Sequence, residues 1–396
     1  MKLNKLTLII SLTSLVFTSE AISATLLKAN DFMGSKLRGF NIGLIENHDD
    51  AYYKELKQSN ANIVRVIIPF ERCVVTAEQM KAAQEKAKDA ESADALEKAM
   101  MPEPSCTYQV SKNTETKFKN LLIKAVENNF YVLPAASFEQ RTPGDFWFTS
   151  KLQQGMSEAW QEFAKNHENN TVIAGYDLMN SPNGTGLPAN SNVSDYWNQG
   201  AGFLIKAIRK VDSKHPIIVT MAPYGQATSL KDFKPFDDKN IVYGINMYYP
   251  YDITMQGTSP TYEYRLPYPA GLEYGIQPNP SQPPKPINSK ELRLHLQSAA
   301  LFGITNKVPI IVSEFGIVHY APDGSGFRYV SDATKIFEEN GWSWIYQGFR
   351  VSKAMDPYIA SDDPEDENRA SNAPIIKVLT SYFNKNGSTV KNNEDE

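Results

Sequence analysis

Residues 308–316, which read V-P-I-I-V-S-E-F-G, constrain the fold of this chain more than any other stretch. The apolar run is almost entirely β-branched, is interrupted only by Pro309, and leads into Ser313 and Glu314. A continuous apolar run of this length, closed by the turn residue Gly316, predicts a strand buried on both faces. Such strands belong to parallel sheets covered by helices, and a carboxylate at the C-terminal tip lies where these folds place their chemistry. The alternative for Glu314 is a strand-end carboxylate bonded to a neighbouring loop.

The remainder of the chain reads as eight strand-then-helix units in one series. The predicted strands cover residues 37–45, 61–70, 130–137, 171–180, 216–223, 241–249, 308–316 and 342–349. The predicted helices cover residues 49–59, 114–129, 155–166, 193–211, 289–305, 327–340 and 373–384. This series predicts a single-domain (β/α)₈ TIM barrel. A doubly wound open sheet is the alternative, but no glycine-rich phosphate loop follows the first strand.

The two ends of the chain differ from the barrel in composition. A basic start at Lys2 and Lys5, an apolar run over residues 6–17 and small residues at 21–24 predict a signal peptide over residues 1–24. A membrane anchor is the alternative, but the apolar run is too short to span a bilayer. We therefore expect export to the periplasm or the extracellular space. The barrel is expected over residues 25–385, and the polar residues 386–396 read as a disordered tail.

Composition limits the possible partners. The chain has 396 residues, of which 41% are hydrophobic, and a formal net charge of −5. Without a basic excess it is not suited to neutralising phosphates, so we expect no nucleic-acid partner. We also expect no membrane partner, no cofactor and no metal, since no Cys/His spacing is typical of a metal site. The protein is expected to be a monomer.

Cys73 and Cys106 are the two cysteines of the chain. In an exported protein an isolated pair favours one disulfide, and two free thiols are the alternative. Between them lies an Ala/Glu/Lys-rich run, residues 77–100, whose composition predicts a helix with a weak apolar stripe. We expect this insertion to be a solvated decoration held by the disulfide.

In a barrel, the C-terminal ends of all strands meet at one mouth. The candidate residues at this mouth are Arg65, Glu139, Trp147, Asn180, Ser181, Asn246, Tyr248, Glu314, Trp344 and Gln347. Carboxylate, arginine, amide, phenol and indole groups together suit a carbohydrate cleft. The set contains no metal triad, no phosphate cradle and no Ser-His-Asp arrangement.

These motifs resemble the family 5 glycoside hydrolases, the cellulase family of TIM barrels. The resemblance covers nearly the whole chain after residue 24, from L-R-G-F-N-I-G through N-I-V-R-V-I-I-P-F to V-P-I-I-V-S-E-F-G and G-W-S-W-I-Y-Q-G-F-R. It implies that Glu314 is the nucleophile of a retaining glycosidase and that Arg65 braces it. Tyr248 matches a tyrosine of the family's sixth strand, whereas Asn246 and Gln347 stand where the family often has His, and Trp or His. The candidate substrate contacts at the mouth are Asn246, Tyr248, Trp147, Trp344, Gln347 and Glu139.

The chain departs from the family pattern at the fourth predicted strand, where the family ends in Asn-Glu-Pro and this sequence reads Asn180-Ser181-Pro182. The acid/base glutamate is thus replaced by Ser181, which has no useful acid near neutral pH. A retaining glycosidase needs two carboxyl groups about 5 Å apart. Glu139 and Asp145, on the loop after the third strand, are the candidates for a substitute acid, and two solvated loop carboxylates are the alternative.

Two main hypotheses follow. The first is a hydrolase of a β-linked poly- or oligosaccharide with Glu314 as nucleophile and a missing or substituted acid. The second is a carbohydrate-binding protein that keeps the cleft and has lost turnover. A generic surface scaffold is the third reading. Tyrosines at 262, 264, 268 and 274 on a Pro-rich loop form either a wall of the cleft or the packing of the loop on itself.

Overall fold

A computed structural model of the chain describes residues 24–44, 48–140, 149–184, 187, 190–262, 265–272 and 285–387. Several predictions lie outside these residues. They are the signal peptide up to residue 23, Asp145, Trp147, Tyr264, Tyr274 and the end of the tail from residue 388. Asn386, at the start of the predicted tail, is described and accepts a hydrogen bond from Arg38 Nη1 at 2.9 Å. Contacts with the barrel therefore continue one residue beyond the predicted boundary.

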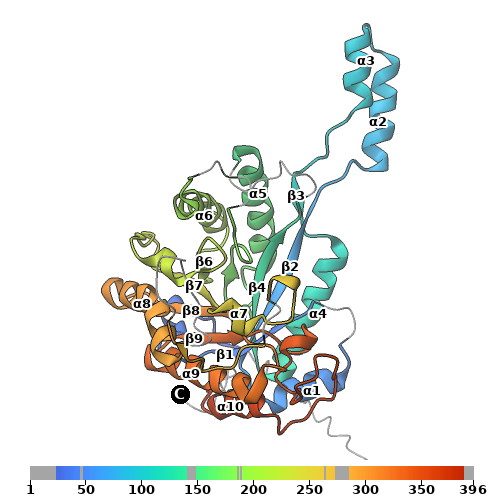
Figure 1. The fold of residues 1–396 in the computed structure, drawn as a ribbon. Coiled ribbons are helices and arrows are strands. Elements are labelled where there is room, and N and C mark those ends of the chain that lie inside the picture. Colours follow the sequence, from blue (N-terminus) through green and yellow to red (C-terminus); the bar gives the residue numbers. More distant parts are fainter. Residues whose placement is uncertain are drawn as a thin grey trace, which may run out of the picture.

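Within the described residues, eight parallel strands close into a barrel (Figure 1). They are β1 (Arg38–Ile42), β2 (Ile63–Arg72), β4 (Tyr131–Phe138), β5 (Tyr176–Asp177), β6 (Ile217–Thr220), β7 (Ile241–Met247), β8 (Ile310–Phe315) and β9 (Ser343–Tyr346). Strand β1 pairs in parallel with both β2 and β9, so the sheet closes on itself. This closure confirms the predicted (β/α)₈ barrel and excludes the open sheet.

Helices cover the outside of the barrel. The long ones are α1 (Asp50–Gln58), α4 (Lys112–Asn128), α5 (Ser150–His167), α6 (Val193–Arg209), α8 (Ser289–Asn306), α9 (Ser325–Glu339) and α10 (Pro374–Phe383). Asp49, Ser111 and Asn288 cap α1, α4 and α8, because each side chain accepts a hydrogen bond from a backbone N–H of the first turn. Each helix in the described part of the chain falls short of what a membrane crossing requires.

The fifth unit of the barrel lacks a full helix, and the predicted helices likewise leave residues 224–240 without one. Strand β6 is followed there by the single 3-10 turn η2 (Ala227–Leu230). The other short elements are η1 (Ala29–Phe32), α7 (Tyr251–Thr254), η3 (Pro260–Tyr262), η5 (Pro322–Gly324) and η6 (Lys353–Met355). Of these, α7 and η3 belong to the loop that follows β7 at the mouth.

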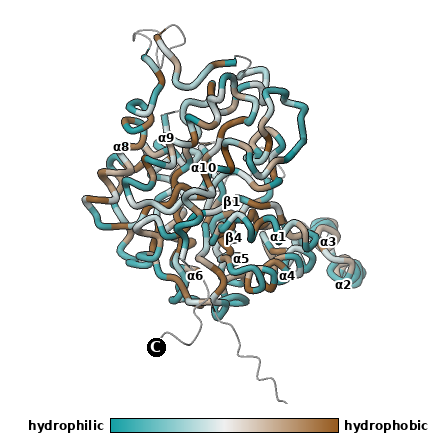
Figure 2. The backbone as a smooth tube through the Cα atoms, turned by 90° about the horizontal axis from the view of Figure 1, so that it is seen from below, coloured by the Kyte–Doolittle hydropathy of each residue, from teal (hydrophilic) through white to brown (hydrophobic). Residues whose placement is uncertain are grey.

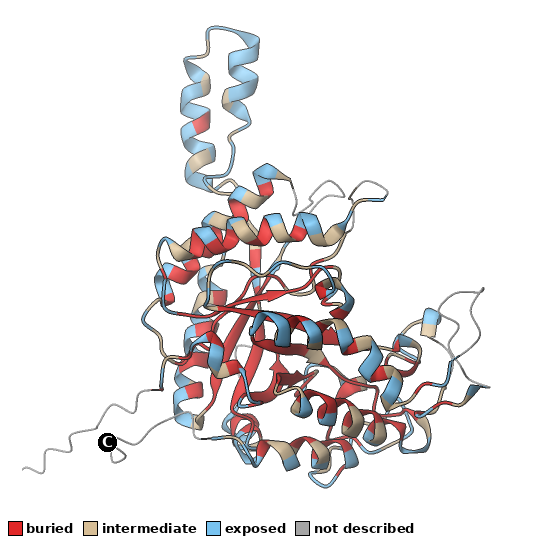
Figure 3. Ribbon diagram, turned by 90° about the vertical axis from the view of Figure 1, so that its left-hand side faces the viewer, coloured by how far each residue is buried: buried red, intermediate tan, exposed pale blue. Residues whose placement is uncertain are grey.

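The core fills the barrel and the layer between strands and helices (Figure 3). Every residue of β1 and of β7 is buried, as expected for strands covered on both sides. The helices are amphipathic, so hydrophobic and hydrophilic stretches alternate along α4 and α5 (Figure 2). In α4 the buried residues Phe118, Leu121, Leu122 and Ala125 recur at the spacing of one helix face.

The insertion between Cys73 and Cys106 projects away from the barrel (Figure 1). Strand β2 extends past the barrel and pairs antiparallel with β3 (Tyr108–Gln109), and a pair of helices follows from this base. The pair consists of α2 (Ala77–Lys88) and α3 (Ala93–Met100), so the predicted single helical run is broken at residues 89–92. Ser92 caps α3 at the break.

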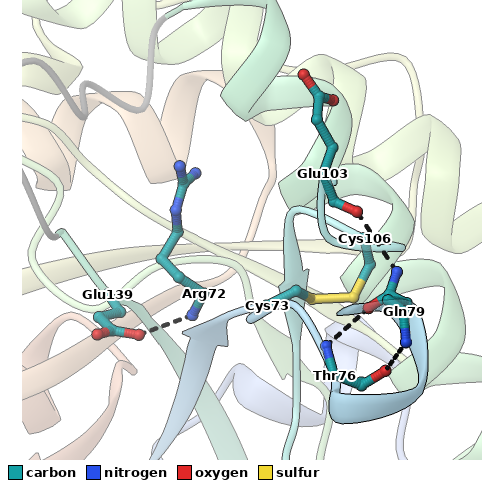
Figure 4. The surroundings of a disulfide bond; sticks show 7 residues. All are labelled: Arg72, Cys73, Thr76, Gln79, Glu103, Cys106 and Glu139. Atoms are coloured by element: carbon teal, nitrogen blue, oxygen red, sulfur yellow. Dashed lines mark hydrogen bonds between the residues drawn. A yellow bond between two sulfur atoms is a disulfide. The ribbon is translucent and has the colours of Figure 1, made fainter. Parts of the chain in front are cut away.

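The predicted disulfide is present. Cys73 and Cys106 are bonded across 33 residues of sequence, at the base of the helix pair (Figure 4). Beside it, Thr76 and Gln79 form a reciprocal capping box at the start of α2. Ala83 is the buried residue of α2, and α3 buries none, so the insertion is solvated as expected.

Candidate active site

Arg65, on β2, is the centre of a hydrogen-bonded cluster inside the barrel and is 1% exposed. Its Nε donates to Asp177 Oδ2 at 2.9 Å, and its Nη2 donates to Asn180 Oδ1 at 2.8 Å. Its Nη1 donates to Glu314 Oε1 at 2.9 Å and to Asn41 Oδ1 at 3.0 Å. A buried guanidinium is tolerated only when its charge and its donors are matched. Two carboxylates and two amide oxygens meet that requirement and fix the position of each partner.

Glu314, at the end of β8, is the carboxylate of this cluster that reaches open space. Its side chain is 13% exposed, whereas that of Asp177 is 0% exposed. Its Oε1 is held by Arg65, and its Oε2 accepts a hydrogen bond from the Tyr248 hydroxyl at 3.2 Å. Asn41 Nδ2 donates to the backbone oxygen of Ser313 at 3.0 Å, which fixes the strand directly before Glu314. The carboxylate is therefore held in one orientation at the mouth.

Burial shapes the protonation of the groups around Arg65. Burial and the nearby Glu314 raise the pKa of Tyr248 well above its ordinary value, so its hydroxyl keeps its proton and donates to Glu314. Burial also raises the pKa of Asp177, while Arg65 and a hydrogen bond from Thr220 Oγ1 at 3.0 Å act in the opposite direction. Asp177 thus lies below Glu314 as a support for Arg65, facing away from solvent.

Ser181 follows Asn180, a partner of Arg65, after β5. Its backbone has a φ of 46°, in the left-handed region that few non-glycine residues occupy. Its Oγ accepts a hydrogen bond from Asn246 Nδ2 at 3.1 Å. The β7–β8 pairing shifts register between Ile245 and Asn246, and Asn246 then lies opposite Glu314. The Asn246 amide therefore contacts Ser181 from a backbone position that pairs with Glu314.

Asn246 is held by a tight turn after β6. Its Nδ2 also donates to the backbone oxygen of Tyr224 at 3.1 Å. The next residue, Gly225, has a φ of +75°, and a Cβ there would lie 2.6 Å from Asn246 Cγ. Only glycine allows this approach, so the turn fixes the amide that contacts Ser181.

A hollow of about 320 Å³ opens beside Ser181. Its lining residues are Tyr108, Ser137, Phe138, Gln140, Met179, Asn180, Ser181, Pro182 and Asn183. Ring faces next to hydroxyl and amide groups suit a neutral, hydroxyl-rich ligand. A larger hollow of about 540 Å³ lies between α1 and α4 but contains no member of the Arg65 cluster. We place the site by its chemistry, at the smaller hollow.

The remaining candidate residues occupy different places. Glu139 is exposed at the end of β4, and its Oε2 accepts a hydrogen bond from the Arg72 backbone N–H at 2.7 Å (Figure 4). Gln347 follows β9 and is partly buried, with its backbone N–H bonded to the Phe315 oxygen at 2.8 Å. Both residues lie at strand ends on the mouth side, as predicted.

Trp344 requires a correction. Its side chain is 0% exposed, its Nε1 donates to Glu338 Oε1 on α9 at 2.8 Å, and its ring stacks on Phe383 of α10 at 5.3 Å between centroids. The indole therefore points outward into the layer between β9 and the helices. The predicted substrate contact at Trp344 is wrong, because the side chain faces away from the barrel interior.

Asn41 and Thr220 are members of the cluster that the sequence did not single out. Asn41 lies in the all-buried strand β1, and Thr220 ends the apolar strand β6. A polar residue inside an otherwise apolar barrel strand could have predicted membership of such a cluster, because a buried polar side chain needs a hydrogen-bond partner. Among the described residues, no group of three or more His, Cys, Asp or Glu side chains is placed to hold a metal ion.

The profile of the cellulase family, glycosyl hydrolase family 5, matches residues 27–349. The chain belongs to this family. Endoglucanase 3 of Fibrobacter succinogenes is 28% identical over 215 residues, which are 49% of this chain and 32% of that protein. Endoglucanase C of Acetivibrio thermocellus is 26% identical over 250 residues, which are 58% of this chain and 68% of that protein. The family 5 chain thus spans about a third of the first relative's length and about two thirds of the second's.

Solved structures share the fold of this family 5 chain. Endoglucanase Cel5A of Thermotoga maritima superposes with a TM-score of 0.66 at 18% identity, covering 89% of this chain and 100% of that one. The cellulose synthase subunit Z of Clostridioides difficile superposes with a TM-score of 0.60 at 18% identity, covering 87% and 99%. At this identity the likeness establishes the barrel architecture alone.

Proposed function

We propose that this protein is a glycosidase that acts on O-glycosidic bonds of a β-linked glucan, with Glu314 as its nucleophile. The observation that carries the proposal is the placement of Glu314 at the mouth, between Arg65 at 2.9 Å and Tyr248 at 3.2 Å. A retaining glycosidase requires a carboxylate that attacks the anomeric carbon. Membership of the family supports this role, and the names of the endoglucanase relatives support a glucan as substrate.

In this proposal the cluster orients the nucleophile and stabilises its charge. Arg65 partly neutralises the charge on Glu314 Oε1, and the Tyr248 hydroxyl donates a hydrogen bond to Glu314 Oε2. As Glu314 attacks, its oxygen bonds to the anomeric carbon, the glycosidic C–O bond breaks, and the negative charge of the carboxylate passes to the leaving oxygen. Because the donors are already in place, little reorganisation accompanies the step. Asn180, fixed by Arg65 Nη2, lies at the same mouth and is available to a sugar hydroxyl.

The finer part of the proposal concerns Ser181, which we place where a retaining enzyme needs its acid/base. The serine hydroxyl accepts from Asn246 and offers no proton of suitable acidity. Among the described residues, Arg65 bonds to one carboxylate besides that of Glu314, namely Asp177. Asp177 is buried against Arg65 and Thr220 and faces away from the mouth. Glu139 is held by the Arg72 backbone. Cleavage should therefore depend strongly on the leaving group.

The contact between Ser181 and Asn246 also supports a second function, that of a carbohydrate-binding protein. If Ser181 and Asn246 form a permanent wall of the cleft, the protein binds a β-glucan without turning it over. The lining of the hollow beside Ser181 supports binding in either case. We also propose that the protein works outside the cytoplasm, since the Cys73–Cys106 disulfide persists in oxidising compartments. We further propose that it acts as a monomer.

The test is covalent trapping of the nucleophile. A 2-deoxy-2-fluoro aryl β-cellobioside slows both steps but has a leaving group that departs without a proton. We expect the wild-type protein to gain one fluoroglycosyl group, located on the peptide that contains Glu314, and Glu314→Gln to gain none. Binding of cello-oligosaccharides without any labelling would support the binding protein instead. Neither labelling nor binding of any β-glucan would refute both functions.

A further inference from the structure

One guanidinium in the barrel interior faces two carboxylates. Arg65 Nε donates to Asp177 Oδ2 at 2.9 Å, and Arg65 Nη1 donates to Glu314 Oε1 at 2.9 Å. The side chains of Arg65 and Asp177 are 1% and 0% exposed, and that of Glu314 is 13% exposed. With both carboxylates ionised, the three groups together carry one negative charge in excess. Asp177 thus adds a buried charge that holding Glu314 in place does not itself require.

The surroundings of Asp177 suit its ionised form. Its two oxygens each accept a hydrogen bond, Oδ2 from Arg65 and Oδ1 from the Thr220 hydroxyl at 3.0 Å. Burial raises the pKa of Asp177, Arg65 and the Thr220 bond act against this, and the charge on Glu314 adds to it. A protonated Asp177 would need an acceptor for its own hydrogen, whereas both of these partners donate to it. The hydrogen bonds therefore favour the carboxylate over the acid.

Asp177 and Glu314 act on each other across Arg65. The charge on Glu314 is one of the causes that raise the pKa of Asp177. Because a Coulomb interaction is mutual, the charge on Asp177 also raises the energy of the Glu314 carboxylate. This repulsion ends when Glu314 becomes an uncharged ester. The charge on Asp177 then remains with Arg65, and without it the ester would leave a buried guanidinium short of a counter-charge, which is costly.

We propose that Asp177 is a positioning residue whose charge, acting through Arg65, makes Glu314 a stronger nucleophile and balances the guanidinium in the glycosyl enzyme. This inference rests on the proposed function and concerns its first chemical step. In that step a Glu314 oxygen bonds to the anomeric carbon, the bond from this carbon to the leaving oxygen breaks, and the leaving group departs with the electron pair. Arg65 passes from two anionic partners to one, so the buried cluster becomes neutral as the step proceeds.

A purely structural role for Asp177 predicts a different result. If Asp177 only holds Arg65 in place, its loss lets Arg65 move away from Glu314, which would then need a higher pH to ionise. If Asp177 contributes its charge, its loss removes a repulsion, and Glu314 stays ionised to a lower pH. The acidic limb of the pH profile therefore moves in opposite directions under the two roles.

The experiment measures the rate of covalent labelling by the 2-deoxy-2-fluoro aryl β-cellobioside as a function of pH. Asp177→Asn removes the charge and keeps the shape. Its amide oxygen can accept from Arg65, and the Thr220 hydroxyl can accept from its amide nitrogen while turning its own proton towards Ser313 Oγ, 3.4 Å away. We expect the first-order labelling constant to fall by about 10²-fold and the acidic limb to move down by about one pH unit. The concentration for half-saturation should change by less than about twofold, because Asp177 does not reach the open mouth.

Three further variants complete the experiment. Asp177→Glu keeps the charge, so its acidic limb should stay at the wild-type position even if the added methylene slows labelling. Asp177→Ser removes the charge with a smaller side chain and replaces the asparagine variant if that one fails to fold. Asp238→Asn is the matched control, because Asp238 Oδ2 also accepts from an arginine Nε, that of Arg209 at 2.6 Å, and lies before β7, away from the mouth. It should be labelled like wild type at every pH.

Slower labelling with the acidic limb displaced to lower pH in the variants without the charge, and wild-type behaviour of Asp238→Asn, supports the role of Asp177. An acidic limb that stays in place or moves to higher pH overturns this role and leaves Glu314 as the nucleophile. A wild-type labelling rate in Asp177→Asn overturns it as well. If the wild-type protein itself gains no label, the proposed nucleophile fails, and the role of Asp177 fails with it.

Discussion

Replacing Ser181 with glutamate should restore the missing proton transfer. The backbone at this position already holds a non-glycine residue at a φ of 46°, so a longer side chain adds no backbone strain. The adjacent hollow of about 320 Å³ has room for the added methylene and carboxyl groups. Asn246 Nδ2, 3.1 Å from the serine oxygen, would then lie beside the new carboxyl as a donor.

The expected gain follows from what a positioned acid/base contributes. We expect kcat/KM on an unactivated β-glucan to rise by 10²–10⁴-fold, which is about 2.7–5.5 kcal/mol of transition-state stabilisation. Ser181→Gln is the matched control, because glutamine has nearly the shape of glutamate but no acidic proton. Its kcat/KM on the unactivated glucan should stay at the wild-type level. Activity on an aryl glycoside with a good leaving group should rise less, since its first step needs no acid.

The assay is steady-state and burst kinetics on both substrate types, with and without azide. In the wild-type protein, azide should accelerate release of the glycosyl enzyme, because this anion attacks without a base. The reasoning is refuted if wild type cleaves unactivated glucan efficiently, if azide has no effect on it, and if Ser181→Glu brings no gain. That combination would point to another acid, with Glu139 as the first residue to substitute.

Three further outcomes are expected. Glu314→Gln should abolish turnover yet bind cello-oligosaccharides within about tenfold of wild type, because the nucleophile acts mainly in the transition state; a much larger loss by calorimetry would assign it a role in ground-state binding. His295 stacks on Tyr249 with 4.2 Å between ring centroids, and burial lowers its pKa from 6.5 to about 4. As the pH falls, this histidine is therefore protonated in the unfolded chain before it is protonated in the folded one. The free energy of unfolding should decrease as the pH drops from 6.5 towards 4. Denaturant unfolding should show up to about 3 kcal/mol of this acid loss in wild type and its absence in His295→Phe, and parallel pH curves for the two proteins would contradict the assignment. The double substitution of Cys73 and Cys106 by serine should make residues 89–92 sensitive to protease, while the barrel's thermal transition stays near that of wild type, because α2 and α3 pack mainly on each other. A large shift of the main transition would show that the insertion stabilises the barrel.

The sequence by itself determined the barrel and its strand order. Long β-branched runs that are closed by turn residues predict doubly covered strands, and a series of them with helices between leaves few topologies. The position of Glu314 at a strand tip, the position of Arg65 on its strand and the pairing of Cys73 with Cys106 were predictable on the same grounds. The positions of Glu314 and Arg65 follow from local strand patterns, and the disulfide follows from there being one possible cysteine partner. Patterns and cysteine counts can both be read directly from the sequence.

Only the tertiary structure decided which side chains meet. The contact between Ser181 and Asn246 joins residues 65 positions apart and depends on a register shift between β7 and β8, which no local pattern encodes. The direction of Trp344 was equally unpredictable, because a strand that is buried on both faces shows no alternation between apolar and polar residues. The inner and outer faces of such a strand differ only in the neighbours that the closed barrel supplies, and α9 and α10 supply those of Trp344.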